Sequence, residues 1–314
     1  MIALIQIILI SMGLFLLITG ARWLIDGAIG LAERFGIPPL LLGLSFVAFG
    51  SSMPEATVSV MSVWKGNVDI AIGDLIGSST ANILLVLGIS ALLRTCAVSK
   101  KTLYIEIPYM ILVTAFFLGM GLQFGRISRG LGIGCLIGFL LYFCYLLYLV
   151  NHKQDPGISW ELNASDHSVL WDSIRAIVGL GIIFFSSDCI VDSSMVMAKS
   201  MGVTNSVLGV TFVALMTSTP ELFATAIALR KNHMELALGT VIGSNLFNLL
   251  WIMGSIAVVK PMAMAENFRI DVTVAVGASV LLWLLSIRKK IFQKSGVILL
   301  ALYVAYVMFR LTMN

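Results

Sequence analysis

The sequence reads Ala48-Phe49-Gly50-Ser51-Ser52-Met53-Pro54-Glu55 in its first half and Ala214-Leu215-Met216-Thr217-Ser218-Thr219-Pro220-Glu221 in its second. Each stretch places a proline and a glutamate inside an apolar run long enough to span a membrane. A carboxylate in the middle of a membrane costs roughly 2.5–3.5 kcal/mol. Two such residues in matching contexts therefore indicate a function, and we predict a cation site shared by two duplicated halves.

The two stretches belong to a longer duplication, with an offset of 221 − 55 = 166 residues. Residues 36–93 align with 202–259 without a gap, and about a third of the positions are identical. Small and polar residues match more often than the apolar residues between them. A repeat that preserved only hydrophobicity would show the opposite.

The composition excludes a soluble domain, because 59% of the residues are hydrophobic, 11% are charged and the mean hydropathy is +1.01. We predict an all-α polytopic membrane protein with about ten transmembrane helices. The predicted spans are approximately 2–25, 40–64, 68–93, 103–124, 128–150, 169–198, 203–229, 235–259, 268–287 and 295–313. The lipid bilayer is then the expected partner, and the net charge of +4 does not indicate nucleic acid.

Five spans in each half would make the second half enter the membrane in the opposite direction. This is the inverted-repeat architecture of many secondary transporters, whose binding sites lie near mid-membrane. We predict a first five-helix repeat at 1–150, a connecting loop at 151–168 and a second five-helix repeat at 169–314.

The distribution of lysine and arginine predicts the orientation of the chain. With ten spans, the loops on one side carry 11 of these residues and the loops on the other side carry 7. The positive-inside rule then places both termini outside the cytoplasm. The first span has no basic n-region and is expected to remain as a helix. The four cysteines show no metal-binding spacing, so no cofactor is expected.

The prolines predict breaks in the two helices that carry the glutamates. Pro54 lacks an N–H and crowds the carbonyl of Gly50, and Pro220 does the same to Met216. We expect unpaired carbonyls around 47–50 and 213–216, which only protein or a bound ion can satisfy at that depth. Hydroxyl groups lie within one turn of the carboxylates, on Ser51, Ser52, Thr217 and Ser218. An all-oxygen set suits hard cations such as Ca²⁺ and Na⁺ rather than zinc or copper.

The following helix of each half carries three polar residues at a spacing of four, which places each trio on one helix face. The trios are Asp74, Ser78 and Asn82 in the first half, and Thr240, Ser244 and Asn248 in the second. Glycine pairs nearby, including Gly77 and Gly243, allow a neighbouring backbone to approach closely. We expect these two faces to close the site.

These motifs resemble the alpha repeats of the calcium/cation antiporter superfamily, and in particular those of prokaryotic sodium/calcium exchangers. The resemblance rests on the sequences at 50–55 and 216–221, each followed by Gly-x-x-x-Gly-Ser, at 73–78 and 239–244. It implies alternating access by sliding of the first and sixth spans. It also implies metal ligands at the Ala48 carbonyl, Ser51, Ser52, Glu55, Ser78, Asn82, the Ala214 carbonyl, Thr217, Ser218, Glu221, Ser244 and Asn248.

Several residues depart from the pattern of that family. Met216 replaces a glycine, Ser79 replaces an asparagine, and Asn248 stands where sodium/calcium exchangers often have aspartate. Asp74 replaces an asparagine and is an additional candidate ligand. These changes affect the expected selectivity and stoichiometry more than the expected fold.

Charge balance predicts antiport at such a site. Two carboxylates neutralise one Ca²⁺ or two Na⁺, and the same oxygens cannot hold both loads at once. We therefore predict a calcium/sodium antiporter. We also expect the protein to lie in a prokaryotic cell membrane and to function as a monomer. A calcium/proton antiporter, or an exchanger of Mg²⁺, K⁺ or Mn²⁺, is the alternative. An intramembrane enzyme is less consistent with histidines only at 152, 167 and 233, and a channel is less consistent with an intrachain repeat.

Overall fold

The computed structural model describes residues 2–35, 37, 39–151, 168–199 and 204–312, and these ranges are almost entirely helical. The first half contains α1 (Ile2–Phe35), α2 (Pro39–Leu42), η1 (Gly43–Val47), α3 (Ala48–Ser51), α4 (Met53–Trp64), α5 (Val68–Ala81), η2 (Asn82–Val86), α6 (Leu87–Leu93), β1 (Cys96–Ala97), η3 (Thr102–Glu106), α7 (Ile107–Val113), η4 (Thr114–Leu118), α8 (Gly119–Gln123), β2 (Arg126–Ile127) and α9 (Arg129–Asn151). The second half contains α10 (Val169–Lys199), α11 (Asn205–Leu208), η5 (Gly209–Val213), α12 (Ala214–Thr217), α13 (Thr219–Arg230), α14 (Met234–Leu246), η6 (Phe247–Ile252), α15 (Met253–Val259), β3 (Met262–Ala263), η7 (Glu266–Phe268), α16 (Arg269–Ser286), β4 (Lys290–Ile291) and α17 (Gln293–Thr312).

Nine helical segments in the described ranges are long and apolar enough to cross a membrane, which confirms an all-α polytopic membrane protein. They are Ile5–Phe35, Val68–Leu93, Thr102–Gln123, Arg129–Leu149, Val169–Ile190, Ser206–Arg230, Met234–Val259, Glu266–Ser286 and Gln293–Thr312. The remaining predicted span, about 40–64, is helical from α2 to α4 but is not one of the nine. The count of ten therefore stays a prediction.

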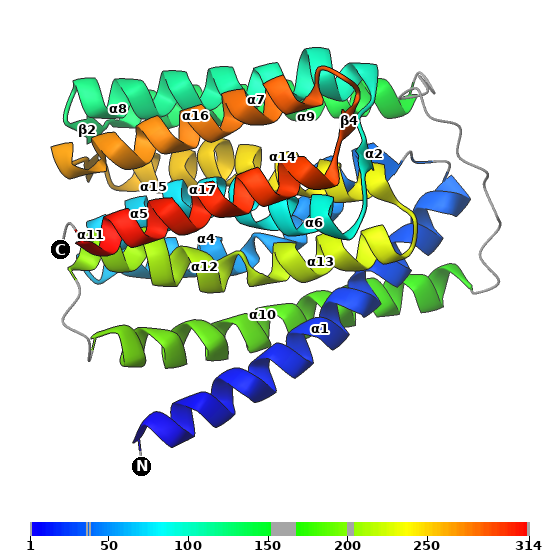
Figure 1. Ribbon diagram of the computed structural model, residues 1–314, viewed down its shortest axis with the longest axis horizontal. Helices are drawn as coiled ribbons and strands as arrows, with labels where there is room; N and C mark the ends of the chain where they lie inside the picture. Colours follow the sequence, from blue (N-terminus) through cyan, green and yellow to red (C-terminus); the bar gives the residue numbers. More distant parts are fainter. Residues whose placement is uncertain (1, 36, 38, 152–167, 200–203, 313–314) are drawn as a thin grey trace.

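The first span is longer than predicted, because α1 continues to Phe35 rather than ending near residue 25. The extra turns pack against α10, and the two long helices run side by side along one face of the molecule (Figure 1). Their close packing includes Gly179 of α10, where an added Cβ would lie 3.0 Å from the Leu24 Cα. The predicted loop at 151–168 lies almost wholly outside the described residues.

The centre of the molecule is formed by α5 and α14, which belong to its two most buried spans. Each of these helices packs against the other half of the chain. α5 contacts η5 and α12, whereas α14 contacts η1 and α3. The two halves of the duplication are therefore interlocked, and each central helix lies against the proline-containing segment of the opposite half.

Two short β ribbons show how the duplicated segments are placed. β1 pairs with β4 in antiparallel fashion, and β2 pairs with β3. The offset of 166 superposes β1 on β3, yet their partners β4 and β2 lie at opposite ends of the helical bundle (Figure 1). Equivalent segments thus lie at opposite ends, as inverted repeats require. The division at 1–150 and 169–314 into five spans each remains a prediction.

Both glutamate-bearing helices break where the repeats match. α3 ends at Ser51 and α4 begins at Met53, and the intervening Ser52 has φ −86° and ψ 9°. Ser218 separates α12 from α13 in the same way, with φ −77° and ψ 3°. Each proline lies in the first turn of the following helix, where its missing N–H leaves no hydrogen bond unmade.

Candidate cation-binding site

Two glycines allow the central helices to contact the broken helices of the opposite half. A Cβ added to Gly77 would lie 2.7 Å from the Cβ of Ala214, and one added to Gly243 would lie 2.7 Å from the Cβ of Ala48. These two contacts are related by the offset of 166. The close approach predicted for the glycine pairs is present, and it brings Ser78 and Ser244 next to the breaks.

Glu55 and Glu221 are both fully buried at these breaks. The Oε1 atom of Glu221 accepts a hydrogen bond of 2.9 Å from Ser52 and one of 3.3 Å from Ser244. Its Oε2 atom and both carboxylate oxygens of Glu55 accept none from the described residues. Three carboxylate oxygens are thus buried without a protein donor, which is costly unless another positive group satisfies them.

Hydroxyl groups of the two halves meet beside the carboxylates. The Oγ atoms of Ser51 and Ser244 are 3.5 Å apart, and the Ser78 Oγ is 3.1 Å from the Thr217 Oγ1. Each of these pairs joins a broken helix to the central helix of the opposite half. The Ser218 hydroxyl is buried and has no hydrogen-bond partner in the described chain.

Asp74 is the third fully buried carboxylate of this region. Its Oδ1 accepts hydrogen bonds from Thr217, at 2.8 Å, and from Ser78, at 3.3 Å. Its Oδ2 accepts one from Ser59, at 3.0 Å. The sequence analysis does not predict Ser59 as part of the site. Ser59 lies four residues after Glu55, a spacing that places both residues on one face of α4. The corresponding trio member Thr240 instead donates to Leu236 of its own helix.

The two asparagines of the trios differ in their surroundings. The Asn82 amide nitrogen donates to the Asn245 Oδ1 at 3.0 Å, whereas neither amide atom of Asn248 has a partner among the described residues. Asn245 was missed by the sequence reasoning, because the duplication aligns it with Ser79 rather than with another asparagine. The Asn82 Oδ1 and the Asn248 Oδ1 remain available as oxygen ligands.

The expectation of bare carbonyls is wrong for Ala48 and Ala214. The Ala48 oxygen accepts the Ser52 N–H at 3.1 Å, and the Ala214 oxygen accepts the Ser218 N–H at 3.0 Å. The reason is that the breaks fall at Ser52 and Ser218, so the helix before each break still includes the N–H group that bonds the alanine carbonyl. A carbonyl oxygen has two lone pairs, so these oxygens can still accept a second partner.

The electrostatic character of the region follows from its three carboxylates. The ion pairs recorded in the described ranges join Arg34 to Asp172, Lys231 to Asp26 and Arg310 to Asp271, all outside the site. No three His, Cys, Asp or Glu side chains of the described residues converge on one metal position. A cation here would be held by at most two carboxylates at a time, supplemented by hydroxyl, amide and carbonyl oxygens.

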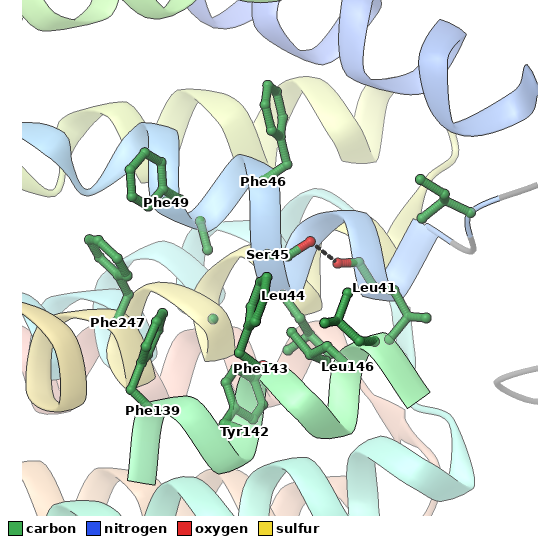
Figure 2. Close-up of a pocket in the computed structure, with 14 residues that line it drawn as sticks. Leu41, Leu44, Ser45, Phe46, Phe49, Phe139, Tyr142, Phe143, Leu146 and Phe247 are labelled. Carbon is green, nitrogen blue, oxygen red and sulfur yellow. Dashed lines mark hydrogen bonds between the residues drawn. The ribbon is translucent and has the colours of Figure 1, made fainter. Parts of the chain in front are cut away.

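A separate cavity of about 410 Å³ lies beside the site, between the first broken helix and α9 (Figure 2). Its lining is mainly apolar, with Phe49, Phe139 and Phe247 on one side. The hydroxyl of Ser45 donates to the Leu41 carbonyl at 2.6 Å and is therefore already satisfied. The cavity contains no carboxylate and lacks the chemistry of a cation site.

Comparison with known proteins assigns the chain to a family. The profile described as "Sodium/calcium exchanger protein" matches residues 5–151 and 173–312. The chain is 34% identical to CaxA of Alkalimonas amylolytica over 313 residues, covering 96% of this chain and 98% of that protein. It is 32% identical to the inner membrane protein YrbG of Escherichia coli over 291 residues, covering 88% of each. A structure of the sodium-calcium exchanger NCX_Mj matches with a TM-score of 0.81 and 28% identity, covering 98% of both chains.

The fold and the buried oxygen cluster therefore define a polytopic cation antiporter. The chain belongs to the sodium/calcium exchanger family, as its full-length matches show. The family is one of transporters rather than of enzymes.

Proposed function

We propose that this protein exchanges calcium for sodium across a membrane by alternating access. The observation that carries the proposal is the burial of Glu55 and Glu221 without a basic partner among the described residues, which also leave three of the four carboxylate oxygens without a hydrogen bond. One Ca²⁺ or two Na⁺ would neutralise the pair. Because the same oxygens cannot hold both loads, binding of one ion displaces the other.

The proposed ligands of the transported cations are the oxygens that surround the two breaks. They are Glu55, Glu221, Ser51, Ser52, Thr217, Ser218, Ser78, Ser244, Asn82, Asn248 and the carbonyls of Ala48 and Ala214. The cross-half contacts of Ser52 with Glu221 and of Ser51 with Ser244 support this set. The name of the similar exchanger NCX_Mj supports sodium as the second ion.

A calcium/proton antiporter is the second candidate. The unpaired carboxylate of Glu55 favours it, because a buried carboxyl group without a cation is least costly in its neutral, protonated form. Asn248 supports the same candidate. Its amide supplies a ligand oxygen but no negative charge, so the site lacks a third carboxylate to balance a further sodium ion.

The proposed location is the inner membrane of a prokaryotic cell, with the protein acting as a monomer and both termini outside the cytoplasm. The excess of basic residues in one set of loops and the similarity to an inner membrane protein support this placement. A reporter that is active only outside the cytoplasm, fused after residue 314, tests the orientation. An active fusion is expected, and an inactive one would contradict the proposed orientation.

Uptake of radioactive calcium into proteoliposomes tests the function directly. The unsubstituted protein, Glu55→Gln and Glu221→Gln are compared under an imposed Na⁺ gradient and under an imposed pH gradient. Glu266→Gln is the matched control, because Glu266 is exposed in the short helix η7, which precedes α16.

Sodium-driven uptake that is lost in both site variants and kept in the control is the expected result. Uptake driven only by the pH gradient would identify the calcium/proton antiporter. Absence of glutamate-dependent calcium uptake under either gradient would contradict the calcium assignment, and uptake assays with Mg²⁺, K⁺ and Mn²⁺ in place of Ca²⁺ would then identify the transported ion.

A further inference from the structure

Asp74 breaks the symmetry of the duplicated site. The offset of 166 relates Asp74 to Thr240, Ser59 to Thr225 and Thr217 to Ser51. In one copy, the carboxylate accepts three hydroxyl hydrogen bonds, whereas in the other Thr240 bonds its own helix and Thr225 has no recorded partner. The same set of positions thus carries a negative charge in one copy and none in the other.

The contacts of Asp74 are with hydroxyl groups that surround its carboxylate. Its three recorded side-chain contacts are all donated to it by hydroxyl groups, at 2.8–3.3 Å. A carboxylate in its charged form only accepts hydrogen bonds, and these three hydroxyl donors match that form. Among the residues that the structure describes, no third acidic side chain converges with Glu55 and Glu221 on one metal position. Asp74 is therefore placed behind the hydroxyl groups rather than among the direct ligands.

Each hydroxyl that donates to Asp74 is oriented by that bond. Asp74 Oδ1, at 2.8 Å, is the nearest acceptor of the Thr217 hydroxyl, ahead of two carbonyls of its own helix at 3.1 and 3.3 Å. With the protons of Thr217 and Ser78 directed toward Asp74, their oxygen lone pairs are left for a cation on the other side. Ser59 holds the second carboxylate oxygen and so fixes the plane of the group. Asp74 also adds a negative charge close to the site without occupying a ligand position.

We infer that Asp74 is a positioning and selectivity residue, which orients Thr217 and Ser78 and whose charge favours the divalent over the monovalent cation. This inference rests on the proposed function. The physical reason is that the energy of an ion in a given potential is proportional to its charge, so Ca²⁺ gains twice as much as Na⁺. Removing the charge of Asp74 should therefore lower the affinity for both ions. The fold-change for calcium should be the square of the fold-change for sodium.

The test measures two half-saturation constants on purified protein. Radioactive calcium binding without sodium gives the first, and displacement of that calcium by sodium gives the second. Asp74→Asn keeps the shape of the side chain and removes its charge. Asp69→Asn is the matched control, because Asp69 lies in the first turn of the same helix and lines a different cavity at the end of the bundle.

For Asp74→Asn, a loss of calcium affinity of about tenfold should accompany a loss of sodium affinity of about threefold, following the ratio of ionic charges. The control should leave both constants unchanged. Equal changes for the two ions, or no change, would overturn the inference. Complete loss of calcium binding, as expected for Glu55→Gln, would make Asp74 a direct ligand and would also overturn it.

Asp74→Glu keeps the test decisive if the asparagine variant does not fold. This variant retains the charge, so the ratio of the two constants should stay near that of the unsubstituted protein even where both affinities fall. A ratio shifted toward sodium would exclude the charge as the cause of selectivity. An unsubstituted protein that binds no calcium would instead contradict the proposed function itself, which separates the two failures.

Discussion

Ser52 donates a hydrogen bond of 2.9 Å to Glu221, a residue 169 positions further along the chain in the other half of the duplication. Within the part of the chain that the structure describes, the counterpart hydroxyl, that of Ser218, has no hydrogen-bond partner, and the Glu55 carboxylate accepts no hydrogen bond. The two carboxylates therefore have equivalent positions in the sequence and different surroundings in this conformation. A transporter built from inverted repeats requires such a difference, because symmetric surroundings would open both ends alike.

This asymmetry predicts unequal effects of two equivalent substitutions. Ser52→Ala removes a donor from a buried carboxylate, and hydrogen bonds to charged groups contribute about 1.5–3 kcal/mol. We expect calcium half-saturation to rise by about tenfold or more for Ser52→Ala, and by less for Ser218→Ala. Calcium-dependent uptake in proteoliposomes measures both. Equal effects would show that the contact of Ser52 with Glu221 does not distinguish the two sites.

Close packing at the central glycines predicts a loss of stability. Gly77→Ala and Gly243→Ala each place a Cβ 2.7 Å from an alanine Cβ, and overpacking typically costs about 1–3 kcal/mol. We expect a lower thermal unfolding temperature in detergent for both variants. Gly277→Ala is the control, since no atom lies within 4 Å of its added Cβ and alanine favours the helix. Unchanged unfolding temperatures for both site variants would contradict the interlocked packing.

The amide contact between the halves predicts a further structural effect. Asn245→Ala leaves the Asn82 amide nitrogen without its 3.0 Å partner, and an unsatisfied buried donor costs about 1–3 kcal/mol. Thermal unfolding should therefore occur at a lower temperature. Asn267→Ala is a control, because Asn267 is exposed and its amide nitrogen donates to Ser206 near the end of the bundle. A variant as stable as the unsubstituted protein would show that water replaces the lost contact.

An ion pair links α1 to the segment that follows α13. Lys231, which follows α13, pairs with Asp26 of α1, whereas the counterparts Lys65 and Asp192 are in no ion pair between described residues. Exposed pairs contribute at most about 1 kcal/mol. Asp26→Asn should thus change the transport rate by no more than about fivefold and hardly affect thermal stability. The exchange Asp26→Lys with Lys231→Asp should restore the rate, and a charge exchange that fails to do so would exclude the pair from the transport cycle.

Much of the candidate site could be predicted because its polar residues are unusual within apolar, membrane-spanning segments. Glutamate and proline inside apolar spans are rare, and their recurrence at a fixed offset located Glu55, Glu221 and the adjacent hydroxyl residues without a structure. The membrane class followed equally directly from composition. These properties depend on residues close together in the sequence or on the repeat itself.

Other features depend on how the halves cross, and the sequence does not contain that information locally. The contact of Thr217 with Asp74 joins residues 143 positions apart, and that of Asn82 with Asn245 joins residues 163 apart. Neither separation equals the repeat offset. The sequence predicts the first break too early, because a proline inside a helix disrupts the preceding turn. In the structure the break falls at Ser52, and Pro54 lies in the first turn of the following helix.

Calorimetric titration of calcium into the purified protein tests the central claim most directly, that Glu55 and Glu221 together hold the transported ion. The account predicts calcium binding by the unsubstituted protein and by Glu266→Gln, and its loss in both Glu55→Gln and Glu221→Gln. Sodium should weaken the binding by competition. Undiminished calcium binding in either site variant would contradict the account.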